Sequence, residues 1–199
     1  MTSRTTIRAE TSLPDAYFEG LYARDVDPWR FETSAYERAK YDATLAALER
    51  PRYARALEVG CSIGVLTRDL ARRCDALVAT DVAEAALAKA RARCADLRHV
   101  VFVRQRAPES WPAGTFDLVV LSEVLYYLDP AGVDGVAARV RASLEPGGEV
   151  VLVHWIGETD YPLSGDEAVA RFAAALGPGF SEGRSERAPD YRLDTLRRT

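Results

Sequence analysis

Two apolar segments of the sequence each lead to an acidic residue, and a pair of glycines follows the first of them. The first segment contains Glu58 and runs into Gly60 and Gly64, and the second ends at Asp81, 17 residues after Gly64. A strand, a tight glycine turn, a helix and a second strand with an acid at its tip form a βαβ unit that binds nucleosides. The sequence therefore predicts a nucleotide site in a parallel α/β sheet.

Apolar segments and turn residues alternate along the rest of the chain. Strands are expected near 54–59, 76–80, 99–104, 116–122 and 149–155, and helices near 63–73, 83–95, 131–144 and 164–176. The polar runs 180–187 and 191–197 are expected to pair as a terminal hairpin. This alternation predicts a doubly wound, mostly parallel α/β sheet that binds ligands at the carboxyl ends of its strands.

The length of 199 residues fits a single domain, 1–199. Two helical patterns precede the sheet, and Pro28 between them argues against one continuous helix. We expect a disordered segment 1–13, helices 14–25 and 34–48 within a cap that spans 14–50, and a core over 54–199.

The composition excludes several classes of partner. A net charge of -4 gives no reason to expect nucleic acid or an anionic membrane as the main partner. No apolar run approaches the roughly 20 residues that cross a bilayer, and residues 1–13 lack the apolar stretch of a secretory signal. Three cysteines without a CxxC pair indicate reduced thiols and no zinc or other metal site. A cytoplasmic protein with a small-molecule partner is expected, and its oligomeric state stays open.

The glycine spacing separates two classes of nucleotide. A GxGxxG loop starting at Gly60 would need glycines at positions 62 and 65, where the sequence has Ser62 and Val65. A carboxylate at Glu58 would repel the pyrophosphate of a dinucleotide, which normally sits at such a helix N-terminus. The same carboxylate can hold the ammonium group of S-adenosylmethionine, directly or through water. The pattern favours S-adenosylmethionine as the cofactor.

These motifs resemble those of the class I S-adenosylmethionine-dependent methyltransferases. The stretch 58–64 is similar to their first motif, Asp81 to the acid that binds ribose, and 116–121 and 144–148 to the fourth strand and the turn before the fifth. The resemblance implies a Rossmann-like, seven-stranded sheet whose last strand is antiparallel. This sequence has Arg106 at the position where many of these enzymes have an acid that accepts a hydrogen bond from the adenine amino group.

A narrower resemblance links the chain to the NodS-type branch of these enzymes. The motifs that carry it are Asp27-Pro28-Trp29-Arg30-Phe31, the stretch 34–41, Ser122-Glu123-Val124-Leu125-Tyr126-Tyr127-Leu128 and His154-Trp155. The resemblance implies N-methylation of a free amine on a deacetylated chitooligosaccharide. A small aminosugar or oligosaccharide is therefore the expected acceptor.

The cofactor site is expected to draw on the N-terminal cap and on the first strand ends. The residues are Trp29, Arg30, Glu58, Gly60, Cys61, Ser62, Gly64, Asp81, Val82, Arg106, Ala107 and Ser122. In this hypothesis Arg30 pairs with the methionine carboxylate and Trp29 lies near the sulfonium. Adenine would rest on backbone groups of 105–108, and Asp81 either binds ribose, caps the next helix, or does both.

The acceptor side is expected to follow the fourth and fifth strands. Glu123 and His154 are the candidate catalytic residues, either of which can take a proton from an amine or bind the ammonium. Candidate substrate contacts are Tyr36, Tyr126, Tyr127 and Asp160, the last in a loop with Tyr161 that is expected to cover the site. Tyr36 and Lys40 share a helix face, with a role in the pocket or a purely structural one.

Four functions remain open at this point. The first is N-methylation of an aminosugar or another amine, and the second is O-methylation of a sugar or natural product, with His154 as base. A nicotinamide-dependent oxidoreductase is disfavoured by the missing GxGxxG, and a non-catalytic S-adenosylmethionine-binding module is the fourth.

Overall fold

The computed structural model describes residues 8–199. The expected disorder of residues 1–7 lies outside the described residues, and the expectation is wrong for residues 8–13. Backbone hydrogen bonds hold this segment: the Ala9 N–H donates to the Asp160 carbonyl at 2.8 Å and the Leu13 N–H to the Tyr127 carbonyl at 2.9 Å. The segment thus lies against the loops that follow two strands.

The chain forms seven strands and six α-helices within the described residues. Strands β1 to β7 span Tyr53–Val59, Cys74–Asp81, Val100–Arg104, Phe116–Ser122, Leu144–Trp155, Phe180–Arg187 and Tyr191–Arg198. Helices α1 to α6 span Asp15–Arg24, Ala35–Ala46, Val65–Leu70, Glu84–Arg93, Pro130–Ser143 and Gly165–Leu176, with 3-10 turns at Ala71–Arg73 and Leu125–Tyr127.

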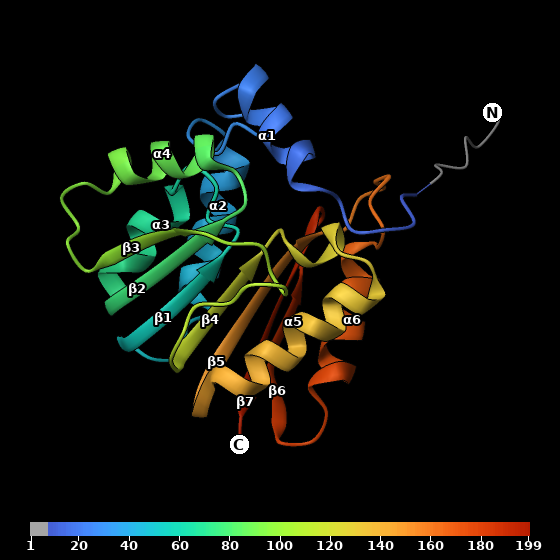
Figure 1. The fold of residues 1–199 in the computed structure, drawn as a ribbon. Helices are drawn as coiled ribbons and strands as arrows, with labels where there is room; N and C mark the ends of the chain where they lie inside the picture. Colours follow the sequence, from blue (N-terminus) through green and yellow to red (C-terminus); the bar gives the residue numbers. More distant parts are fainter. Residues whose placement is uncertain (1–7) are drawn as a thin grey trace.

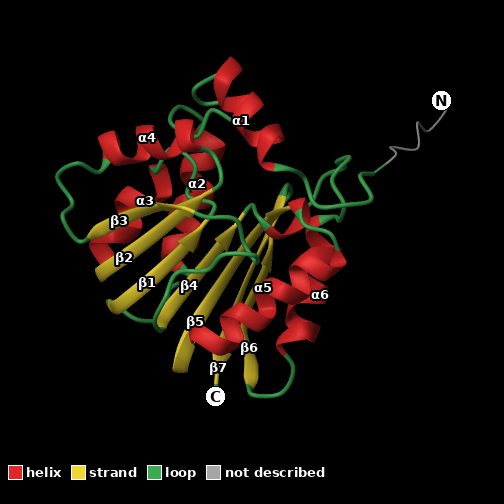
Figure 2. Cartoon of the chain, viewed as in Figure 1, coloured by secondary structure: helices red, strands yellow, loops and turns green. Residues whose placement is uncertain are grey.

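The strands make one sheet in the order β3-β2-β1-β4-β5-β7-β6 (Figures 1 and 2). Strands β1 to β5 pair in parallel, and β7 lies antiparallel between β5 and β6. The doubly wound sheet and the terminal hairpin predicted from the sequence are confirmed. The order reverses between β1 and β4, which is where open α/β sheets bind ligands.

Strand β4 shows why helices cover both faces of the sheet. It is buried along almost its whole length, and successive side chains of a strand point to opposite faces. Val119 and Leu121 pack into the core beneath α5 and α6, whereas Leu118 and Val120 pack with residues of α2 and α3. Figure 1 shows α5 and α6 on one side of the strands and α2 and α3 on the other.

Two boundaries differ from the sequence-based expectation. The helix predicted over 63–73 begins only at Val65, because Gly64 is left-handed at φ 78°, and a 3-10 turn replaces its last part. The fifth strand begins at Leu144, five residues before the predicted start at 149, because Leu144 pairs with Phe116 ahead of the Pro-Gly-Gly turn. Neither change moves the carboxyl end of a strand.

Gly64 is a position where a side chain is expected to harm the fold. A Cβ there would lie 2.9 Å from Ala90 Cβ and 3.0 Å from its Cα on α4, at a left-handed φ. We expect Gly64→Ala to lower the free energy of unfolding by about 1–3 kcal/mol, measured by urea denaturation. Gly20→Ala on α1 is the control, because nothing lies within 4 Å of its added Cβ; equal stabilities for the two variants would contradict the packing argument.

Candidate active site

A cavity of about 470 Å³ opens at the carboxyl ends of β1, β2, β4 and β5. Residues of α1 and α2 and of the loop after β5 complete its walls. Figure 1 shows α1 lying beyond the tips of the strands, over this edge of the sheet. The topology thus places the cavity where the order of the strands reverses.

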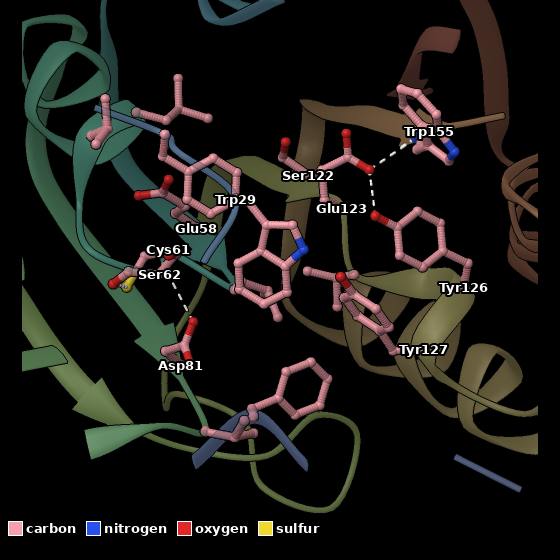
Figure 3. Close-up of a pocket in the computed structure, with 18 of the residues that line it drawn as sticks. Trp29, Glu58, Cys61, Ser62, Asp81, Ser122, Glu123, Tyr126, Tyr127 and Trp155 are labelled. Carbon is pink, nitrogen blue, oxygen red and sulfur yellow. Dashed lines mark hydrogen bonds between the residues drawn. The ribbon is translucent and has the colours of Figure 1, made fainter. Parts of the chain in front are cut away.

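The carboxylate of Asp81 shapes the loop that follows β1. It accepts the Ser62 N–H on Oδ2 at 2.8 Å and the Ala83 N–H on Oδ1 at 2.9 Å; Figure 3 shows the first of these bonds. Burial raises the pKa of Asp81, while these backbone donors oppose the shift. Ala83, not Asp81, is the N-cap of α4. Asp81 therefore lines the cavity without capping the helix.

The turn after β1 requires a glycine at position 60, where Val124 packs against the backbone. Its φ is 78°, and a Cβ there would lie 2.4 Å from Val124 Cγ2. Ser62 also has a positive φ, 51°, and Tyr22 of α1 is 2.5 Å from its Oγ. A glycine at position 60 is needed for both the turn and the close approach.

Glu58 is a buried acid with one side-chain oxygen that accepts no hydrogen bond from residues 8–199. Its side chain lines the cavity, and Oε2 has no hydrogen-bond partner among residues 8–199. Burial raises the pKa of Glu58 to about 8. An unpaired buried carboxyl group is costly, and an ammonium or a water that bridges to one would satisfy it.

Two residues of the segment after β3, Gln105 and Arg106, line the cavity. The Arg106 guanidinium binds the Asp15 carboxylate and donates to the Leu13 carbonyl at 3.0 Å. Gln105 also lines the cavity, and its buried Oε1 is without a partner in the described part of the chain. The amide oxygen of Gln105 is a candidate acceptor at this place that the sequence did not single out; its sequence signal is its position next to Arg106.

Glu123 is held from three sides on the opposite half of the cavity. Lys40 Nζ lies 2.5 Å from Oε1, and Oε2 accepts the Tyr126 hydroxyl at 2.5 Å and the Trp155 N–H at 2.8 Å (Figure 3). Burial opposes ionisation, but Lys40 and these hydrogen bonds hold the pKa of Glu123 below its usual value. Glu123 is therefore an ionised carboxylate whose two oxygens are already in use.

Lys40 is shared with a second acid, Glu37 of the same helix. Its ammonium lies 3.0 Å from Glu37 Oε2 and 5.1 Å from the centroid of the Tyr36 ring. Lys40 is only 3% exposed and Glu37 only 7%. The sequence analysis missed Glu37, although its i,i+3 spacing to Lys40 places both on one helix face.

His154 does not contact the cavity, contrary to its predicted role as a base. The ring is fully buried, and Nε2 accepts the Leu125 N–H at 3.1 Å. Burial lowers the pKa of His154 to about 4, so the imidazole is neutral near pH 7. It supports the 3-10 turn after β4 and lies behind the wall of the cavity.

Most of the other expected site residues come together. Those that line the cavity are Trp29, Tyr36, Glu58, Gly60, Cys61, Ser62, Asp81, Val82, Arg106, Ala107, Ser122, Glu123, Tyr126 and Tyr127. Besides His154, three do not line it: Arg30 and Asp160 are exposed, and Gly64 lies against α4. Because Arg30 has a left-handed φ of 57° in an exposed turn, the predicted pairing with the methionine carboxylate has no support in this geometry.

Aromatic rings form the wall beside Glu123. The Tyr161 ring stacks on Tyr126 at 5.3 Å and meets Tyr127 edge-on at 4.7 Å. Phe18 of α1 packs against Tyr127 at 5.0 Å. Rings with polar tips at the mouth of a cavity suit a ligand that is part apolar and part hydroxylated.

Two further features bear on the kind of site. Within residues 8–199 no group of three His, Cys, Asp or Glu side chains is placed to hold a metal ion, and the three cysteines are buried free thiols. No helix in the same range is long and apolar enough to cross a membrane.

Comparisons with known proteins agree on one family. The family model for Nodulation protein S (NodS) matches residues 18–150, two thirds of the chain. Nodulation protein S of Sinorhizobium fredii is 34% identical over 128 residues, which are 63% of this chain and 59% of that protein. The corresponding protein of Rhizobium tropici is 35% identical over 63% of this chain and 54% of its own length. The chain thus spans less than two thirds of the length of these curated relatives.

Solved structures share the fold. A crystal structure from Pseudomonas syringae, provisionally named a methyltransferase, has a TM-score of 0.74 and 40% identity over 83% of this chain and all of that one. N-methyltransferase NodS of Bradyrhizobium japonicum WM9, in complex with S-adenosyl-L-homocysteine, has a TM-score of 0.80 and 24% identity over 92% of this chain and 96% of that one. The sheet is the Rossmann-like sheet of methyltransferases, and the chain belongs to the NodS family.

Proposed function

We propose that this protein is an S-adenosylmethionine-dependent N-methyltransferase whose acceptor is a small amine, most specifically an aminosugar. The observation that carries the proposal is a continuous cavity with two unlike halves. One half holds Asp81 and the unpaired acid Glu58, and the other holds Glu123 among aromatic rings. A nucleoside fits the first half, and a cationic acceptor fits the second.

The first half suits each part of S-adenosylmethionine. Asp81 can accept hydrogen bonds from the ribose hydroxyls, and the buried Glu58 carboxyl group can bind the ammonium of the amino-acid tail. The adenine would lie between Val82 and Ala107, with the unpaired amide oxygen of Gln105 as acceptor for its amino group. When bound, S-adenosylmethionine supplies a methyl group activated by its sulfonium.

The second half favours a positively charged acceptor. In this half the acids Glu37 and Glu123 line the cavity beside the basic residue Lys40. An amine binds as an ammonium and must lose a proton before it can be methylated. Much of the remaining work is holding the acceptor nitrogen in line with the methyl group.

An aminosugar fits the aromatic wall. The rings of Tyr126, Tyr127 and Tyr161 offer apolar surface to a sugar ring, while their hydroxyl groups can bond its hydroxyls. The NodS protein of Bradyrhizobium japonicum is an N-methyltransferase, which favours nitrogen over oxygen as the methylated atom. The buried, neutral His154 is poorly placed to act as the base of an O-methylation, which also favours nitrogen.

Cofactor binding and a panel of acceptors test the proposal. We expect S-adenosylhomocysteine to bind in calorimetry and NADH not to bind, because the loop after β1 offers an acid where a pyrophosphate would lie. With S-adenosylmethionine, glucosamine and chitobiosamine should give S-adenosylhomocysteine release, and glucose should not. Tight NADH binding without S-adenosylhomocysteine binding would favour an oxidoreductase, and release with glucose alone would favour O-methylation.

A further inference from the structure

We propose that Glu37 on α2 is the carboxylate that receives the ammonium group of the acceptor and takes its proton. The Tyr36 hydroxyl beside it would be the second partner of that ammonium. This inference rests on the proposed methyltransferase function and assigns a residue that its reaction needs. Neither His154 nor Glu123 is positioned to receive the ammonium and take its proton.

Helix α2 presents these side chains to the cavity together. Ser34 caps the helix, and its Oγ accepts the Glu37 N–H at 3.3 Å, which fixes the first turn. Spacings of three and four residues then put Glu37 and Tyr36 next to Lys40 on one face. All three side chains line the cavity, along with Glu123 and Trp155.

The two carboxylates of this cluster differ in what they can still accept. Glu123 receives Lys40 on one oxygen and two further donors on the other. Lys40 donates to Glu37 Oε1 at 3.1 Å, whereas Oε2, although 3.0 Å from Nζ, has no hydrogen bond from any described residue. Within the described chain, Glu37 thus accepts one hydrogen bond where Glu123 accepts three, and is the carboxylate of the pair with more capacity for a further donor.

Tyr36 gives a second, independent sign of a ligand. Its ring meets Trp155 and Tyr191 edge-on at 6.1 and 6.2 Å, yet its buried hydroxyl has no hydrogen-bond partner in residues 8–199. Burial and the nearby acids Glu123 and Glu37 raise the pKa of Tyr36, so the phenol stays neutral. Among residues 8–199 the Tyr36 hydroxyl has no hydrogen-bond partner and Glu37 Oε2 has only its ion pair with Lys40, which indicates where donors of a ligand belong on this wall.

The charge of the cluster fits proton transfer to Glu37. Burial raises the pKa of Glu37 even though Lys40 opposes the shift, which makes this carboxylate a better base than an exposed one. The charges of Glu123 and Glu37 outweigh the effect of burial and raise the pKa of Lys40, which remains an ammonium. Lys40 is a positioning residue that keeps both acids in place.

The proton transfer balances without any further reactant. One N–H bond of the acceptor ammonium breaks, and an O–H bond forms at Glu37 Oε2. The electron pair of the broken bond stays on nitrogen as the lone pair that the methyl transfer requires. Glu37 returns its proton to solvent once the product has left.

Binding of simple amines to the complex with S-adenosylhomocysteine tests the inference. By calorimetry, glucosamine and benzylamine should each bind the wild-type complex. Glu37→Gln should weaken both about tenfold or more, and Tyr36→Phe about threefold or more, since each removes one partner of the ammonium. Asp42→Asn is the matched control, because that carboxylate lies on the same helix and is exposed; its amine affinity should equal that of the wild type.

The outcomes separate the inference from the function on which it rests. Unchanged amine affinity in Glu37→Gln, or no amine binding to a wild-type complex that does bind S-adenosylhomocysteine, would overturn the inference alone. No S-adenosylhomocysteine binding would overturn the function and the inference together. Tyr36→Phe removes a hydroxyl that has no hydrogen-bond partner among residues 8–199. Its melting temperature should therefore match the wild type, and loss of folding cannot explain a loss of amine binding.

Discussion

Replacing Asp81 by alanine should nearly abolish binding of S-adenosylhomocysteine. The carboxylate would no longer receive the ribose hydroxyls, and the Ser62 and Ala83 N–H groups that it now accepts would lose their partner. We expect the affinity to fall roughly 30- to 1,000-fold, about 2–4 kcal/mol. Isothermal titration of the purified variant measures this change directly.

Two further variants show whether the affinity is lost because the ligand contact is missing or because the loop after β1 changes shape. Asp81→Asn keeps an oxygen for one backbone donor but lacks the charge, so it should bind S-adenosylhomocysteine with intermediate affinity. Asp75→Ala lies near the start of the same strand, where its carboxylate is 60% exposed, and should bind like the wild type. An Asp81→Ala variant with wild-type affinity would remove Asp81 from the site.

The cofactor half of the site was predictable because local geometry decides it. An acid at the end of a parallel strand and a glycine turn beside it can be read from the sequence, and the sheet then brings both to the switch point. Asp81 ends β2 and Gly60 directly follows β1, the neighbouring strand, for this reason. The sequence also predicted the strand ends well, because a buried central strand such as β4 is nearly all apolar.

The direction of a side chain at a strand end was not predictable in the same way. His154 and Trp155 are adjacent at the end of β5, and successive side chains point to opposite faces of the sheet. Only the structure shows that Trp155 lines the cavity while His154 is buried behind it. Arg30 likewise depends on a left-handed backbone turn that no neighbouring residue signals.

The acceptor half depends on contacts between distant parts of the chain. Lys40 and Glu123 are 83 residues apart and meet only because α2 and the end of β4 border the same cavity. A weaker signal was available in the composition: Lys40 and Lys89 are the only lysines among 26 basic residues. The Lys40 ammonium is a compact charge that lies within 3.0 Å of an oxygen of each carboxylate.

Removing the Lys40 ammonium should be the most destabilising single change in the site. Lys40→Met keeps the length of the side chain but leaves Glu37 and Glu123 buried without their shared cation. Breaking a buried ion pair from one side costs about 3–5 kcal/mol. We expect a loss of this size in the free energy of unfolding at pH 7.5, measured by urea denaturation.

The sign of the pH dependence of stability shows whether Lys40→Met loses a charge interaction or only packing. In the wild type, the lowered pKa of Glu123 gives stability that is present above the pKa of the unfolded chain and is lost as pH falls through the folded value. Without Lys40, burial should raise both carboxyl pKa values, so the variant loses stability as pH rises above the unfolded value. The difference in unfolding free energy between the wild type and Lys40→Met should therefore be largest at pH 7.5 and become smaller toward pH 4.5.

The second lysine provides the matched control for this experiment. Lys89 lies exposed on α4, so Lys89→Met should leave the unfolding free energy within about 0.5 kcal/mol of the wild type at both pH values. A Lys40→Met variant whose deficit is the same at pH 4.5 and 7.5 would show that packing, not charge, is lost. Glu37 and Glu123 would then not be held as a charged pair, and the acceptor site would lack the fixed carboxylates on which amine binding depends.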